Sequence, residues 1–213
     1  MVCSVELGQN DDAQAYGHAL FSRPDTVKYY DVDYYYYGRS YDELRQYREA
    51  IIEFEKALTM PDSVCLMKRD IIEKDLMQSY AGLGAWNLEQ AEDLKGEQQK
   101  TAYREADTSY AALISRFPEA MEYGTFMRAR CSTYLDPDAR QGLAVPFYLK
   151  LIDVLSTRQP KSELDMGRLT EAYKYMISYY ANVKSDLDTA KEYGMKLYEF
   201  DPEDPIAKQV LNM

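Results

Sequence analysis

One spacing of residues occurs near both ends of this 213-residue chain. Near the start it places an alanine, a tyrosine, a glycine, a leucine and an aromatic residue at Ala13, Tyr16, Gly17, Leu20 and Phe21. Near the end the same order and intervals recur at Ala190, Tyr193, Gly194, Leu197 and Tyr198. Intervals of three and four residues put apolar side chains on one face of an α-helix. The pattern therefore indicates a helical unit that the chain uses more than once.

Two further segments share this spacing, at Ala50, Phe54 and Ala57 and at Ala106, Tyr110 and Leu113. A fifth candidate segment has Ala144, Tyr148 and Leu151. Each of the first four segments meets a proline eleven or twelve residues after its first alanine, at Pro24, Pro61, Pro118 and Pro202. Proline ends helices because it lacks an amide proton and restricts the residue before it. No stretch alternates cleanly between apolar and polar residues. The chain is therefore predicted to be all-α.

The stretch DVDYYYYGRSYDEL, residues 31–44, contains four consecutive tyrosines. Because aromatic residues favour β-strands, propensity alone would predict a strand here. Its spacing indicates a helix instead. Tyr34, Tyr37, Gly38 and Tyr41 have the spacing of the pattern W-x2-L-G-x2-Y, with tyrosine in place of Trp and Leu. Ala50, Phe54 and Ala57 follow at the intervals expected for the next helix. This segment resembles the tetratricopeptide repeat (TPR), a helix–turn–helix unit with that consensus. A last copy runs through Ile177, Ser178, Ala181, Leu187, Ala190 and Pro202.

The resemblance implies an all-α α-solenoid, a right-handed superhelix of antiparallel helix pairs, as in a divergent bacterial-type TPR array. We expect residues 1–213 to form a single array with units at about 1–26 (partial), 31–64, 65–120, 121–158 and 161–202. Residues 203–213 are expected to form a capping helix, because repeat arrays need their last apolar face covered. Ile206, Val210 and Leu211 would provide that cover.

Composition excludes several classes of function. The net charge of −11 and the pI of about 4.7 disfavour nucleic acid as a partner. No apolar run approaches the roughly 20 residues of a membrane span, so membrane insertion is not expected. His18 is the single histidine, and Cys3, Cys65 and Cys131 are far apart. Neither acidic cluster, at residues 135–138 and 201–205, has the EF-hand spacing. We expect no enzyme, no metal and no cofactor.

The first unit leaves about seven residues for its first helix, which is too short to bury a face. The chain is thus expected to be a fragment of a longer protein, with an end unit that has a truncated first helix as the alternative. A signal peptide would then be missing from the sequence. On these grounds the protein is expected to be soluble, in either the cytoplasm or the periplasm.

Ligands of such arrays bind the concave face, which is lined mostly by first helices. Relative to the small residue of each first helix, the residues three before, one after and four after should face inward. This register gives the ligand-groove candidates Tyr35, Arg39, Gln78, Phe126, Arg130, Tyr175, Tyr179 and Asn182. Tyr34, Tyr37 and Tyr41 are expected to pack on the second helix of their own unit. A TPR family that binds C-terminal carboxylates uses lysine and asparagine at such positions, and this set is not reproduced here.

The favoured function is a non-catalytic protein-interaction scaffold that holds a peptide or partner segment in the concave groove. Tyrosines would supply rigid contact area, and Arg39 and Arg130 would bind a carboxylate. In the structural alternative, the tyrosines pack on neighbouring helices and the arginines pair with local Asp or Glu. Two functional alternatives are a glycan-binding module that uses the tyrosine-rich groove and a self-assembly module that forms a homo-oligomer.

Overall fold

The computed structural model describes residues 1–23 and 28–212. Two compact units divide the chain, Met1–Glu89 and Gln90–Met213. The helices are α1 (Val2–Glu6), α2 (Asn10–Phe21), α3 (Asp31–Glu43), α4 (Tyr47–Thr59), α5 (Arg69–Glu92), α6 (Gly96–Arg116), α7 (Met121–Leu135), α8 (Val145–Ser156), α9 (Glu163–Ser178), α10 (Leu187–Phe200) and α11 (Pro205–Leu211). Short 3₁₀ turns cover Asp62–Val64 and Pro118–Ala120, and a π-helical turn covers Tyr179–Lys184.

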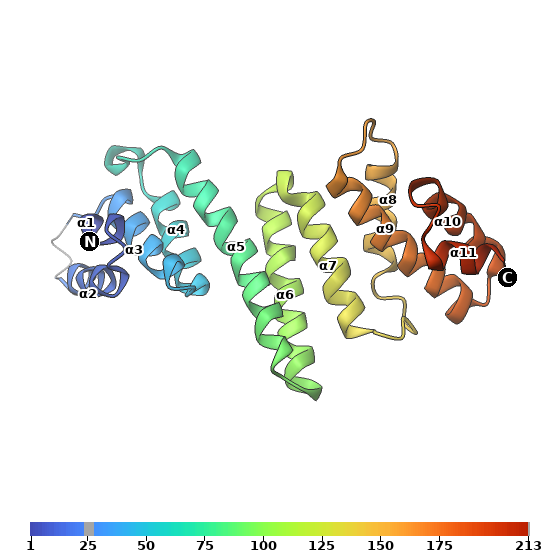
Figure 1. The fold of residues 1–213 in the computed structure, drawn as a ribbon. Helices are drawn as coiled ribbons and strands as arrows, with labels where there is room; N and C mark the ends of the chain where they lie inside the picture. Colours follow the sequence, from blue (N-terminus) through green and yellow to red (C-terminus); the bar gives the residue numbers. More distant parts are fainter. Residues whose placement is uncertain (24–27, 213) are drawn as a thin grey trace. The chain divides into compact units, whose positions relative to one another are not determined.

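The all-α prediction is confirmed, since no strand occurs in the described residues. Within each unit, consecutive helices pack on one another as solenoid repeats do: α2, α3 and α4 in the first, and α6 to α11 in the second. Figure 1 shows α7, α8, α9 and α10 side by side in chain order. Pro24 lies outside the described residues, and the expected unit boundaries stay a prediction.

A close contact of α3 with α4 forms the centre of the first unit. Gly38 sits against Phe54, because a methyl group at Gly38 would come within 2.8 Å of that ring and 3.2 Å of the carbonyl of Ala50. Phe54, Ala50 and Ala57 are fully buried beneath it. The consensus glycine is therefore required by helix packing and not by backbone conformation.

Asp31, at the start of α3, holds the segment that leads into α5. Its side chain is 1% exposed, and its carboxylate accepts hydrogen bonds from the backbone amides of Leu66 (2.7 Å) and Met67 (3.0 Å). Asp136 does the same after α7, where it accepts from the amides of Gln141 and Gly142, each at 2.9 Å. Each buried carboxylate thus accepts hydrogen bonds from backbone amides of a nearby loop.

The run of tyrosines forms a helix, as predicted, but its side chains divide differently from the expectation. Tyr34 and Tyr37 pack on Phe21 of α2, with ring centroids 4.7 and 5.3 Å away. Tyr35 packs on Phe54 of α4, at 5.8 Å. The reason is that α3 lies between two helices, so its apolar surface extends round more than one stripe. The hydroxyl of Tyr37 also lies 2.9 Å from Nδ1 of His18, which gives the single histidine a partner.

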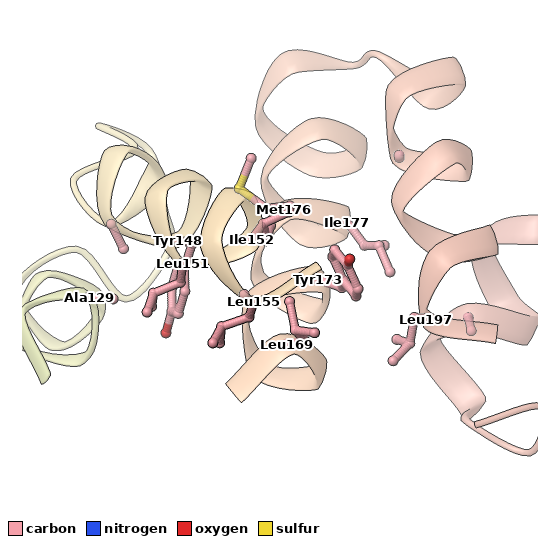
Figure 2. Packing of buried hydrophobic residues seen from close by; sticks show 14 of the residues in the cluster. Ala129, Tyr148, Leu151, Ile152, Leu155, Leu169, Tyr173, Met176, Ile177 and Leu197 are labelled. Carbon is pink, nitrogen blue, oxygen red and sulfur yellow. The ribbon is translucent and has the colours of Figure 1, made fainter. Parts of the chain in front are cut away.

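The core of the second unit lies between α7, α8, α9 and α10. It includes Tyr148, Leu151 and Leu155 of α8, Leu169, Tyr173 and Met176 of α9, and Leu197 of α10. Figure 2 shows these side chains gathered in the spaces between the helices. Cys131 is also buried, on α7, and burial raises the pKa of its thiol to about 12.

The helix α11 covers the end of this core. Ala207 and Val210 are buried, and a methyl group at Gly194 of α10 would meet the Val210 side chain at 2.5 Å. Asp204 caps α11 by accepting hydrogen bonds from the amides of Ile206 (2.9 Å) and Ala207 (3.1 Å). Ile206, which was expected to help cover the core, is instead partly exposed, and Ala207 takes the inward position.

Candidate functional site

The first helices are those that carry the small residue of each predicted unit, namely α3, α5, α7 and α9. Six of the eight predicted groove residues line one of three sites. These sites are the α3/α5 cleft, the α7/α9 cleft and the α9/α11 pocket. Tyr35, Arg39 and Gln78 lie in the α3/α5 cleft, Arg130 and Tyr175 in the α7/α9 cleft, and Asn182 in the α9/α11 pocket. Whether these residues contact a ligand stays a prediction.

The α3/α5 cleft has a volume of about 320 Å³ and belongs to the first unit. The hydroxyl of Tyr35 crosses from α3 to α5 and donates to Asp75 at 2.8 Å. Ser79 of α5 donates in the opposite direction to the carboxylate of Asp42. Arg39 binds Glu6 at 2.8 Å and lies 3.7 Å from Glu43. The bonds of Tyr35 and Ser79 join α3 to α5, whereas Arg39 joins α3 to α1.

Carboxylates outnumber cations in the α3/α5 cleft, where Asp42, Glu43 and Asp75 face Arg39. Burial raises the pKa of Asp42, and the neighbouring charges of Asp75 and Glu43 raise it further. The hydrogen bond from Ser79 acts in the opposite direction, because it stabilises the ionised form. The cleft is thus less suited to an anionic ligand than Arg39 alone suggested.

The α7/α9 cleft lies in the second unit and has a volume of about 370 Å³. Arg130 of α7 binds Glu171 of α9 through two hydrogen bonds, from Nε at 3.0 Å and from Nη2 at 2.6 Å. Glu171 also accepts a hydrogen bond from the buried Tyr148, at 3.0 Å. Glu171 raises the pKa of Arg130, so the guanidinium stays charged. Tyr175 packs on Tyr148 with ring centroids 4.9 Å apart.

The α9/α11 pocket is smaller, about 200 Å³. Its lining has an apolar part, made by Ile177, Ala181, Ile206 and Val210, and a polar part, made by Lys174, Ser178, Asn182 and Gln209. Asn182 lies in the π-helical turn, a geometry that often occurs at functional sites. Its amide donates to the hydroxyl of Ser178 at 3.3 Å, and its side chain is exposed.

Phe126 and Tyr179, the other two predicted residues, lie outside these clefts. The ring of Phe126 packs beneath two guanidinium groups, with Cζ of Arg130 4.7 Å and Cζ of Arg168 5.4 Å from its centroid. Tyr179 is 9% exposed and stacks on Tyr175 at 6.4 Å. Both rings thus pack on other side chains of the protein, and whether either also contacts a ligand stays a prediction.

Residues that line the clefts but were not predicted as groove residues include Asp75, Tyr148, Glu171 and Ile206. Glu171 could have been predicted from the sequence, because it lies one helical turn before Tyr175 on the same face of α9. Tyr148 could not be found in this way, since it lies on α8, a second helix, and the register covers first helices only.

Within residues 1–23 and 28–212, no group of three or more His, Cys, Asp or Glu side chains is arranged to hold a metal ion. Among the described helices, none has the length and apolar character needed to cross a bilayer.

No protein-family model matches the chain, and no curated protein matches it either. Among solved structures, a match is the C-terminal part of a TPR repeat-containing protein from Cytophaga hutchinsonii. The two chains have a TM-score of 0.49 and 24% sequence identity, over 100% of this chain and 85% of the other. That protein carries the repeat that this sequence resembles.

Proposed function

We propose that the chain is a non-catalytic scaffold that binds a segment of another protein across its first helices. The observation that carries this proposal is the coincidence of two independent patterns. The inward register of the repeat was derived from sequence alone, and the clefts follow from atomic positions. Six of eight register-derived residues line those clefts. The α7/α9 cleft and the α9/α11 pocket combine apolar or aromatic lining residues with a few polar groups, which is typical of binding sites.

The proposed binding mode does not use Arg39 and Arg130 to bind a carboxylate of the ligand. Arg39 and Arg130 are both engaged with carboxylates of the protein, so neither is free to bind an anion without losing a partner. Binding would instead use side-chain pockets between helices, with affinity concentrated in a few anchors. The specificity of such binding would come from the spacing of the anchoring side chains along the bound segment.

Peptide selection tests this proposal. A displayed library of random peptides is selected against the intact chain, and the affinity of a selected peptide is measured by fluorescence anisotropy. Gln78→Ala and Asn182→Ala change exposed side chains in the α3/α5 cleft and the α9/α11 pocket. At least one should weaken binding severalfold. Ile52→Ala and Met195→Ala, which change exposed residues of the second helices α4 and α10, are the matched controls and should not. Failure to select any peptide, or weakening by the controls alone, would overturn the proposal.

The glycan alternative required open tyrosine faces in the groove. Tyr179 is buried and Tyr175 is packed against Tyr148 and Tyr179, so neither ring presents the free face that a sugar stacks upon. Peptide binding is therefore the better supported of the two. Self-assembly is tested separately, by light scattering over a dilution series.

A further inference from the structure

We propose that the α3/α5 cleft binds a lysine or arginine side chain of the partner segment, through the carboxylates of Asp42 and Asp75. This rests on the proposed function and adds the chemical class of one anchor that the bound segment must carry. The argument uses residues of the first unit, Met1–Glu89, alone.

The α3/α5 cleft is a candidate site for reasons other than its charge. Its volume of about 320 Å³ lies at the lower end of the roughly 300–1,000 Å³ that ligand pockets have. Three of its lining residues, Tyr35, Arg39 and Gln78, are those that the repeat register places inward. The carboxylates of the cleft therefore select the chemistry of the ligand, whereas the cleft and the register select the place.

Asp42 and Asp75 have hydroxyl partners but no cation. Asp75 accepts from Tyr35 through Oδ2 at 2.8 Å, and Asp42 accepts from Ser79 through Oδ1. Within residues 1–23 and 28–212, neither carboxylate forms an ion pair, and the second oxygen of each accepts no hydrogen bond. Partly buried charges are normally paired. The second oxygens can accept from the N–H donors of an ammonium or guanidinium group.

Arg39, the one cation among the lining residues, is paired with other carboxylates. It binds Glu6 of α1 at 2.8 Å and lies 3.7 Å from Glu43. Its single positive charge is thus shared by two carboxylates before Asp42 and Asp75 are considered. Four carboxylates and one guanidinium leave a local excess of negative charge, which a cation of the partner would reduce.

The ionised form of Asp42 is unfavourable in the free protein. Burial raises its pKa, and the carboxylates of Asp75 and Glu43 act on it more strongly than the guanidinium of Arg39 does. A second cation in the cleft would stabilise the ionised form. Binding a lysine or arginine would therefore relieve a repulsion that the free protein retains, and perturbed groups of this kind cluster at functional sites.

The test begins with a subtractive selection from a displayed library of random peptides. The library is passed over a double variant, Asp42→Asn with Asp75→Asn, and the unbound fraction is selected on the intact wild-type chain. Asparagine keeps an oxygen that accepts from Ser79 and from Tyr35, so the variant should fold, which a thermal melt verifies. The recovered peptides should be enriched in Lys or Arg at one shared position.

A double-mutant cycle then connects the cation of the peptide to the cleft. Fluorescence anisotropy gives the affinity of a recovered peptide and of the same peptide with Gln at the shared position. On the wild-type chain this replacement should weaken binding about tenfold, the effect of losing one charge-assisted hydrogen bond. On the double variant the same replacement should have almost no effect.

Asp11→Asn with Asp12→Asn is the matched control. It removes the same number of charges from exposed positions of α2, in the same unit. Its effect on binding should be small at low salt and absent at high salt, because exposed charges are screened. The coupling of the peptide to Asp42 and Asp75 should persist at high salt, since partly buried pairs are screened much less.

Recovered peptides without an enriched cation, or coupling to the control pair as strong as to the cleft pair, would overturn the inference. If an ordinary selection yields peptides that bind the chain and the subtractive selection yields none, the inference fails and the proposed function stands. If no peptide binds in either selection, both fail.

Discussion

Arg130 and Glu171, which are 41 residues apart in the chain, join the first helices α7 and α9 through two hydrogen bonds of 3.0 and 2.6 Å. Tyr35 and Asp75 join α3 to α5 in the same manner, at 2.8 Å. Residues with a groove-facing register thus connect successive first helices directly. They fix the separation of these helices and shape the clefts between them.

Loss of Glu171 should destabilise the second unit more than loss of an ordinary surface carboxylate. Half-exposed ion pairs contribute about 1 kcal/mol or less. Glu171→Ala also removes the carboxylate that accepts from the Tyr148 hydroxyl at 3.0 Å and leaves that hydroxyl only the more distant Thr133 Oγ1, at 3.5 Å. Loss of a buried acceptor typically costs about 1–3 kcal/mol. Glu171→Gln should cost less, because it keeps an acceptor. The free energy of unfolding in urea, followed by circular dichroism, measures both. Glu192→Ala on the exposed face of α10 is the control, and an equal loss in all three variants would contradict this role.

Two glycine-to-alanine substitutions should have opposite signs. At Gly38 the new methyl group meets the Phe54 ring at 2.8 Å and the Ala50 carbonyl at 3.2 Å, so overpacking should cost about 1–3 kcal/mol. At Gly167, in the exposed part of α9, nothing lies within 4 Å. There the gain in helix propensity should stabilise the protein by about 0.5–1 kcal/mol. Thermal melts of the two variants give the signs, and stabilisation by both would show that α3 and α4 are not in close contact.

The stability of the first unit should rise when Asp42 loses its charge. The folded state raises the pKa of Asp42, chiefly through burial, so the ionised carboxylate destabilises the fold at neutral pH. Asp42→Asn keeps an acceptor for Ser79 and should stabilise by about 1 kcal/mol or less. That difference should shrink as the pH falls through the raised folded-state pKa of Asp42 and vanish below the ordinary unfolded-state value of about 3.9.

Asp186 is the opposite control for that experiment. Hydrogen bonds from Thr189 lower the pKa of Asp186, so its stabilising effect is present at neutral pH. It is lost as the pH falls below the ordinary value of about 3.9 and through the folded-state pKa. Asp186→Asn should therefore lower the melting temperature at pH 7, and its effect should fade only at lower pH. The same sign for both variants would contradict the assignment.

Thiol labelling should distinguish Cys131 from the other two cysteines. Cys3 is exposed and Cys65 is partly exposed, whereas Cys131 is buried with a pKa of about 12. At pH 8 a thiol-specific reagent should modify two thiols of the folded protein and a third only after denaturant is added, because the thiolate is the reactive form. Reaction of all three at similar rates in the folded protein would contradict the burial of α7.

The sequence predicted the helices well, because apolar residues three and four apart record which face of a helix is buried. Ala50, Phe54 and Gly38 occupy the positions expected from the repeat. The directions of Tyr34, Tyr35 and Tyr37 were less predictable, since a periodic stripe does not say which neighbouring helix it meets.

Long-range partners were beyond sequence reasoning for a different reason. Nothing in the spacing near Arg130 identifies Glu171 as its partner, and the sequence did not predict the π-helical turn at Tyr179–Lys184. The spacing of apolar and small residues predicts helices and the close contacts within a helix pair. Ion pairs such as Arg130–Glu171 depend instead on which helices the fold brings together.

Hydrogen exchange with a library-selected peptide tests the central claim most directly. Amide protection is compared in the free and bound chain across first and second helices. The account predicts new protection on α7, α9 and α11, or on α3 and α5, with little change on the exposed faces of α4, α8 and α10. Protection confined to α4, α8 or α10 would contradict the claim that the clefts between first helices bind the partner.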